Sequence, residues 1–226
     1  MSTYTDQYKV FSENIVFAAR ALNYYLLIGK SASEDKKALD ALNVTPRFWT
    51  DYNYMSVQTV IIFLGKIFDT RKDAHGIDKM LQSAEKNLHH FSKLALRERK
   101  GDFSGIDEYI SKAQELSIED IRAMQQQADK AKVLWAKIQP LRNKVFAHNE
   151  QALTVEKRSD LYKQVKYSDL TEVVQILLNI YHGLEQAELN GRVPDFSKDY
   201  DGPKGVAEQQ IADLILRLKG DEEPSY

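Results

Sequence analysis

Two side chains with the chemistry to handle a phosphate group lie close together late in the sequence. They are Arg142 and His148, in the segment LRNKVFAHNE, and Asn143 directly follows the arginine. Arginine stays charged and can hold two phosphate oxygens at once, whereas histidine gains and loses a proton near neutrality. These two abilities together suit binding of a phosphate and proton transfer beside it. We therefore take Arg142, Asn143 and His148 as candidate catalytic residues.

An ideal α-helix through this segment would keep the two charged side chains apart. At about 100° per residue, Arg142 and His148 lie about 60° to either side of Val145 and flank an apolar stripe. Their Cα atoms are then about 9 Å apart along the axis, and Asn143 points nearly opposite Val145. A kink, which Pro140 is expected to produce, or a second copy of the chain would bring the two side chains closer to one phosphate.

Structural roles for the same residues stay open. His148 and Asn149 suit the end of a helix, where the helix dipole favours a protonated histidine and asparagine adopts the left-handed conformation. Arg142 suits an ion pair with Asp69 between two neighbouring helices, which does not exclude phosphate binding. Asp69 and Arg71 by themselves are typical of a polar cluster at a helix end.

The composition argues against several other classes of function. The 226 residues include no cysteine, which excludes disulfides, thiolate metal sites and thiol nucleophiles, and the net charge of −2 excludes a general polycation. The sequence has no glycine-rich phosphate loop, no HExxH motif and no repeated Glu-x-x-His pair, so we expect neither a metal nor a cofactor. The longest stretch without charge, residues 52–65, is too short to cross a bilayer, and the first ten residues do not resemble a signal peptide. We therefore expect a soluble cytoplasmic protein.

The elements that position the candidate residues are predicted to be helices. Prolines are rare within long segments, and apolar residues recur every three or four positions, which indicates an all-α fold. The expected helices cover about residues 5–28, 34–42, 46–68, 77–96, 169–189 and 207–218. A further long helix is expected to begin at residue 117 and to be kinked or interrupted at Pro140.

Two segments of this helical chain resemble a known superfamily. HEPN proteins share an arginine, then a polar residue, then a histidine after four to six intervening positions; here the residues are Arg142, Asn143 and His148, with five between the arginine and the histidine. Upstream, FLGKIFDTRKDAHGIDKML at residues 63–81 is similar to the helix-turn-helix passage of the abortive-infection, Abi-U type, HEPN proteins. Asp69 and Arg71 occupy its acidic and basic positions. The resemblance follows the order of elements over about residues 8–190.

The resemblance implies an up-and-down helical bundle that forms a homodimer and brings two motifs together. Catalytic members are metal-independent endoribonucleases in which the 2′-hydroxyl of the RNA attacks the phosphate and a cyclic phosphate remains. In that reaction His148 would move protons at the 2′-oxygen or the leaving 5′-oxygen, Arg142 would hold the phosphate, and Asn143 would orient the histidine or an RNA oxygen. Supporting or RNA-binding roles fall to Lys144, Asp69 and Arg71.

The expected chain therefore has a HEPN-like domain at residues 1–190, with a variable insertion at about 97–116, and a linker plus C-terminal helix at 191–226 that packs on the domain or on a partner chain. The expected partners are RNA, a second copy of the chain and an antitoxin or regulatory protein. Since many HEPN proteins bind without cleaving, a catalytically silent module that binds RNA, nucleotide or a protein is the alternative. Cleavage of RNA in EDTA would distinguish the two functions.

Overall fold

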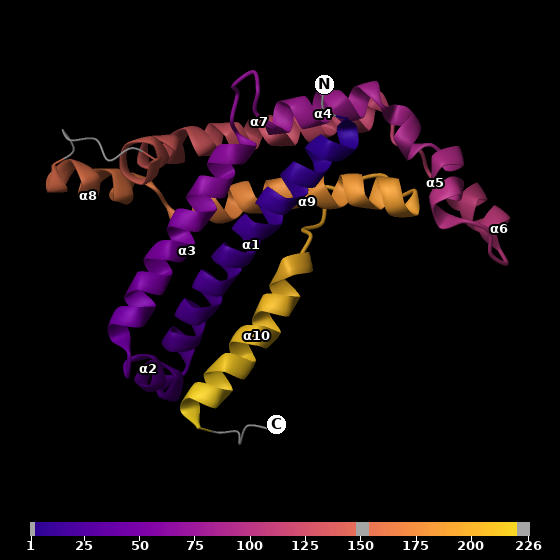
Figure 1. Ribbon diagram of the computed structural model, residues 1–226. Coiled ribbons are helices and arrows are strands. Elements are labelled where there is room, and N and C mark those ends of the chain that lie inside the picture. Colours follow the sequence, from indigo (N-terminus) through magenta and orange to yellow (C-terminus); the bar gives the residue numbers. More distant parts are fainter. Residues whose placement is uncertain (1–2, 148–153, 221–226) are drawn as a thin grey trace. The chain divides into compact units, whose positions relative to one another are not determined.

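The computed structural model describes residues 3–147 and 154–220. These residues form α-helices, one 3-10 turn and one π-helical turn, without any strand (Figure 1). The predicted all-α class is therefore confirmed. Among the described helices, none combines the length and the apolar character that a transmembrane span requires.

The helices follow the chain in a simple order. They are α1 (Tyr4–Glu34), α2 (Lys36–Leu42), α3 (Pro46–Ile67), α4 (Ile77–Lys86), the 3-10 turn η1 (Leu88–Phe91), α5 (Lys93–Lys100), α6 (Ile106–Lys112), α7 (Ile118–Leu141), the π-helical turn η2 (Arg142–Ala147), α8 (Val155–Gln164), α9 (Tyr167–Asn190) and α10 (Gly202–Lys219). They form two compact units: Met1–Ile15 with Leu64–Tyr200, which we call unit 1, and Val16–Phe63 with Asp201–Tyr226, which we call unit 2.

The core of unit 1 lies between α7 and α9, which pack along each other (Figure 1). Both helices present apolar residues every three or four positions, which places those residues on one face. The buried residues of α7 are Ile121, Met124, Ala128, Ala131, Trp135, Ile138 and Leu141. Those of α9 include Leu170, Val173, Val174, Leu177, Ile180, Leu184 and Ala187. Helix α4 also packs on α7.

The ends of these two helices are set by local chemistry. Ser117 and Asp120 form a capping box at the start of α7, where each side chain accepts from the backbone N–H of the other residue. Helix α9 ends at Gly191, whose φ of 58° is the left-handed conformation that glycine adopts most easily.

The expected insertion at 97–116 is tied to the end of α9. It contains the last residues of α5 and all of α6. The guanidinium of Arg99 donates to the carbonyl of Glu188 at 2.7 and 3.1 Å, and the backbone N–H of Gln114 donates to the carbonyl of Gly191 at 2.7 Å. The segment is therefore fixed within unit 1 by hydrogen bonds to carbonyls that α9 cannot satisfy itself.

Unit 2 has a separate core, made by α2, α10 and the part of α1 that follows Ile15. Five buried aliphatic residues form its centre, with the aromatic rings of α3 around them: Ile28, Ala38, Leu42, Ile211 and Ile215, beside Trp49 and Tyr52. At its edge, Asp35 caps α2 and accepts a hydrogen bond from Lys219 at 3.0 Å. The C-terminal helix is therefore part of a core.

Candidate functional site

A cavity of about 420 Å³ lies where the end of α3, the loop after it and the end of α7 meet in unit 1. It brings together four of the six predicted site residues, although they come from two segments about seventy positions apart. Its lining is Gly65, Phe68, Asp69, Thr70, Arg71, Trp135, Gln139, Arg142 and Asn143. The two segments that resemble HEPN proteins thus meet in space.

Arg142 is the half-buried cation of this cavity. Its Nη1 donates to the amide oxygen of Asn143 at 3.0 Å, and no carboxylate among the described residues forms an ion pair with it. The side chain passes closely over Gly65, where an added Cβ would lie 2.9 Å from Arg142 Nε. An arginine that is held in place but not neutralised keeps donors available for an anion such as phosphate.

The carboxylate in the lining of this cavity, that of Asp69, is bound by Arg71. Arg71 Nη2 donates to it at 2.7 Å, Nε donates to both of its oxygens at 3.0 and 3.1 Å, and the backbone N–H of Arg71 adds a further bond at 3.0 Å. These hydrogen bonds hold the pKa of Asp69 below its ordinary value of 3.8, and the charge of Arg142 lowers it further. The possible Asp69–Arg142 ion pair is therefore replaced by a local pair with Arg71, and Arg142 acts on Asp69 through space.

The loop that carries Asp69 and Arg71 is fixed from α4. The ammonium group of Lys79 donates to three loop carbonyls, those of Arg71 at 2.6 Å, Lys72 at 2.7 Å and Ala74 at 3.0 Å. Gly76, the residue before α4, leaves no room for a Cβ, which would overlap the carbonyl oxygen of Asp69. The loop therefore holds its residues in one arrangement beside Arg142.

The segment after Pro140 is not an ideal α-helix. Proline lacks the N–H that would bond to the carbonyl four residues earlier, and the chain continues from Arg142 to Ala147 as a π-helical turn. The ideal-helix estimate, which directs Asn143 away from the stripe, therefore does not hold, and Asn143 lines the cavity beside Arg142. Lys144 is exposed and does not line it. His148 and Asn149 lie outside the described residues.

A smaller cavity of about 210 Å³ shares Phe68, Asp69 and Trp135 with the first and extends it toward α4. The rings of Phe68 and Trp135 stack at 5.4 Å beneath both. On its far side Lys132 Nζ contacts the carboxylates of Asp78 at 2.5 Å and Asp129 at 2.9 Å. Arg142 thus differs from Lys132 and Arg71, because both of those cations have carboxylate partners.

Three of the residues that shape the cavity were not found by sequence reasoning. They are Gly65, Lys79 and Gln139. A glycine inside an apolar helical pattern is a signal of close approach by another group, so Gly65 could have been noticed. Lys79 and Gln139 carry no such signal. Among the described residues, no group of three acidic or histidine side chains is placed to hold a metal ion.

The comparisons with known proteins identify the family of the chain. Residues 1–201 match the family model HEPN_AbiU2, described as AbiU2. The chain belongs to the AbiU2 family of HEPN proteins. The family is of the abortive-infection type, which confirms the resemblance drawn from the two segments. No curated protein and no solved structure matches the chain.

Proposed function

We propose that this AbiU2-family protein is a toxin-type endoribonuclease of the cytoplasm that cleaves RNA without a metal. The observation that carries the proposal is Arg142, a half-buried cation without a described carboxylate partner, in a cavity lined mainly by polar groups. A phosphate of the RNA backbone is the ligand that such a guanidinium suits best.

In the proposed reaction the 2′-oxygen of the substrate attacks the adjacent phosphorus and loses its proton to a base. The bond from phosphorus to the 5′-oxygen breaks, and that oxygen takes a proton from an acid. The products are a 2′,3′-cyclic phosphate and a free 5′-hydroxyl. Arg142 would bind the phosphate oxygens as negative charge grows on them, and His148 would transfer the protons. Asn143 would hold the guanidinium in place through the bond that it already accepts.

The remaining predicted residues would act around this centre. Arg71 is exposed even though Asp69 binds it, and it would contact a neighbouring phosphate. Exposed Lys144 would contact the RNA backbone outside the cavity.

A homodimer would complete the site. The reaction requires a base and an acid, and each chain offers one histidine at its motif. Two motifs that face each other would supply both groups. Light scattering at micromolar concentration should report a dimer, and a strict monomer that still cleaves would contradict the composite site. An antitoxin or regulatory protein remains an expected partner of the dimer.

The proposal is tested by cleavage of RNA with the full chain in EDTA. Arg142→Gln and His148→Ala should each lower the rate by roughly a factor of 10² to 10⁴. Arg122→Gln, which removes an exposed arginine of α7 outside the cavity, is the matched control and should cleave normally. Substrates with deoxyribose at the cleavage position should resist, and the products should end in cyclic phosphate.

One result would reverse the proposal. If the wild-type chain never cuts RNA and both variants lose their fold, Arg142 and His148 are structural residues. The silent module that binds RNA, nucleotide or protein would then be the better description.

A further inference from the structure

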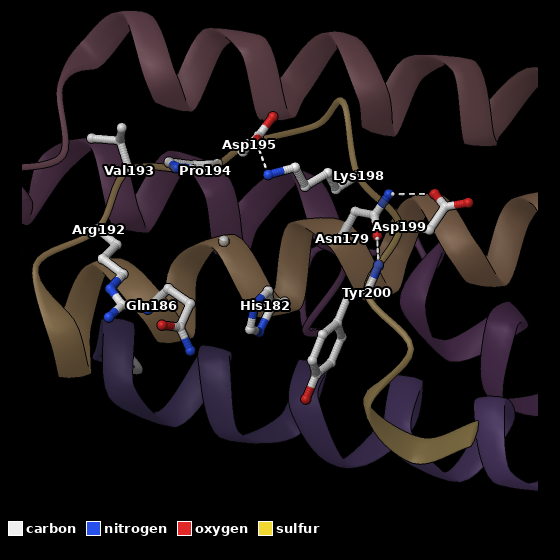
Figure 2. Close-up of a pocket in the computed structure, with 11 residues that line it drawn as sticks. Asn179, His182, Gln186, Arg192, Val193, Pro194, Asp195, Lys198, Asp199 and Tyr200 are labelled. Carbon is white, nitrogen blue, oxygen red and sulfur yellow. Dashed lines mark hydrogen bonds and ion pairs between the residues drawn. The ribbon is translucent and has the colours of Figure 1, made fainter. Parts of the chain in front are cut away.

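A second cavity in unit 1, of about 450 Å³, lies away from every predicted site residue. It is formed by the C-terminal half of α9 and by the extended segment 191–200 that follows it, and it lies outside the proposed function. Figure 2 shows the side chains of Arg192, Gln186, His182 and Tyr200 in a row along α9. A volume of this size is within the range of pockets for small molecules, about 300–1,000 Å³.

The wall opposite α9 is held in place by hydrogen bonds. The amide of Asn179 accepts from the backbone N–H of Tyr200 at 2.9 Å and donates to Asp199 at 3.3 Å, while Gln175 donates to the carbonyl of Tyr200 at 3.2 Å. Gly183 lets the segment approach, since an added Cβ would lie 3.0 Å from Pro194 Cβ. The cavity is therefore formed before any ligand arrives.

The carboxylates of this cavity are already occupied. Asp195 accepts from the backbone N–H of Ser197 at 3.0 Å and from its hydroxyl, and lies 3.7 Å from Lys198 Nζ. Asp199 accepts from Asn179. Both carboxylates therefore help to hold the segment 191–200 in place.

Two of the remaining groups of the lining are hydrogen-bond donors, those of Gln186 and Arg192. Gln186 accepts from Asn190 at 2.9 Å through its oxygen, while its Nε2 has no partner among the described residues. The guanidinium of Arg192 likewise has no described partner, and its backbone N–H bonds to the carbonyl of Gln186 at 3.2 Å, which keeps the two residues adjacent. Two donors on adjacent residues, neither bound to a described acceptor, favour an oxyanion.

The rest of the lining offers flat and apolar surface. The ring of His182 stacks on that of Tyr200, with centroids 3.8 Å apart and planes 4° apart. Val193 and Pro194 are half-buried on the other wall. We infer that this cavity binds a small phosphorylated ligand of nucleotide size, with its phosphate on Arg192 and Gln186 and its uncharged part against Val193, Pro194 and the two rings.

Isothermal titration calorimetry of the full chain tests this inference with four probes: AMP, ribose 5-phosphate, inorganic phosphate and adenosine. AMP or ribose 5-phosphate should bind saturably, and the difference between them tells a nucleotide from a sugar phosphate. Adenosine should bind at least tenfold more weakly, because it lacks the phosphate. Inorganic phosphate that binds as tightly as both organic phosphates would overturn the assigned ligand size.

Two variants locate the phosphate. Arg192→Met should weaken binding of AMP by roughly tenfold to a hundredfold, as expected for loss of a hydrogen bond between charged groups. Gln186→Glu keeps the oxygen that Asn190 binds but replaces the amide nitrogen with a second carboxylate oxygen. It should therefore weaken the binding of AMP at least as much as Arg192→Met does, and leave the binding of adenosine unchanged. The matched control Arg122→Met should bind as the wild type does. Circular dichroism checks that each variant folds.

The outcome is separate from that of the proposed ribonuclease. Arg142→Gln should bind AMP normally, since Arg142 lines the other cavity. If Arg142→Gln abolishes binding while Arg192→Met does not, or if the wild-type chain binds no phosphorylated probe at millimolar concentration, the inference is wrong.

Discussion

Gly65 gives the side chain of Arg142 its place in the cavity. It is buried in α3, and an alanine methyl group there would come within 2.9 Å of Arg142 Nε. Alanine is favoured over glycine inside a helix by about 1 kcal/mol, so Gly65→Ala should fold well and move the flexible guanidinium instead. A displacement of about 1 Å can cost a factor of about 10² in rate, and we expect RNA cleavage to fall by about that much.

Gly29→Ala is the control for this change. Gly29 also lies inside a helix, but an added Cβ there meets nothing within 4 Å. Both variants should retain the wild-type midpoint of unfolding within a few degrees, and only Gly65→Ala should lose cleavage. Equal cleavage by the two variants would show that the position of Arg142 does not matter for the reaction.

The ion pair between Asp69 and Arg71 makes the stability of the folded chain depend on pH. Hydrogen bonds from Arg71 lower the pKa of Asp69 from 3.8 in the folded state. The folded state therefore favours the ionised carboxylate, and this stabilisation is complete above the ordinary pKa and is lost as the pH falls from 3.8 through the lower folded pKa. Urea denaturation of wild type and Asp69→Asn should show a difference that is constant near pH 6 and shrinks below about pH 4. A difference that stays constant down to pH 2 would contradict the role of this pair.

The sequence predicted which residues lie in the site better than it predicted which of them contact each other. Motif spacing pointed to Arg142 and Asn143 and to Asp69 and Arg71, and the fold gathers all four in one cavity. The sequence did not show which arginine Asp69 would bind. Arg71, two residues away, can reach the carboxylate within its own turn, whereas the reach of Arg142 depends on how the loop after α3 and the end of α7 come together at the cavity. That arrangement follows from contacts between segments far apart in the sequence, which no local pattern encodes.

At the level of elements, the loop between α3 and α4 depends on Lys79. Its three hydrogen bonds to loop carbonyls should be lost in Lys79→Met, which keeps the aliphatic part of the side chain. The carbonyls of this loop can be solvated again, so we expect a cost in stability of only about 1 kcal/mol. Hydrogen exchange of residues 70–75 should become faster, because the loop samples more conformations.

Lys86→Met provides the comparison, since Lys86 is an exposed lysine of the same helix. In Lys86→Met, the amide hydrogens of residues 70–75 should exchange at the same rates as in the wild type. If Lys79→Met also leaves exchange unchanged, then Gly76 and the Asp69–Arg71 pair are enough to hold the loop.

Three helix ends could be predicted, because each depends on local chemistry. The start of α7 at Ser117 and Asp120, the start of α3 at Pro46 and the end of α9 at Gly191 all agree with the sequence. Ser117→Ala should remove one side of the capping box and lower the free energy of unfolding by about 1 kcal/mol, measured by urea denaturation. Ser33→Ala, at an exposed position inside α1, should change it by less than about 0.5 kcal/mol.

Elements without an apolar stripe were missed. Helix α8 buries none of its residues, so the periodicity that reveals other helices is absent. The expected helix at 77–96 is interrupted at Asn87 and Ser92, where a 3-10 turn separates α4 from α5. Helix α1 continues through Gly29 to Glu34, because a glycine alone does not end a helix. The π-helical turn is a shift in hydrogen-bond register, which hydrophobic spacing does not record.

On the scale of the whole molecule, the residues covered by the family match differ from the residues that make up the folded units. The match ends at residue 201, and α10 begins at Gly202. Ile211 and Ile215 of α10 are nevertheless buried in the core of unit 2 with Ile28, Ala38 and Leu42. The helix that the family model omits is therefore needed to cover apolar residues that the family model includes.

Replacing one core residue of α10 should loosen unit 2. Ile215 is 7% exposed, and Ile215→Ala should cost about 2–5 kcal/mol, through lost burial and the cavity left behind. Leu218→Ala removes a side chain of the same helix that is 40% exposed and should cost much less. Hydrogen exchange should show faster exchange in α2 for Ile215→Ala than for Leu218→Ala. Because the carboxylate of Asp35 still pairs with Lys219 in both variants, a difference between them reports the apolar core alone. Equal exchange of α2 in the two variants would show that α10 does not stabilise this core.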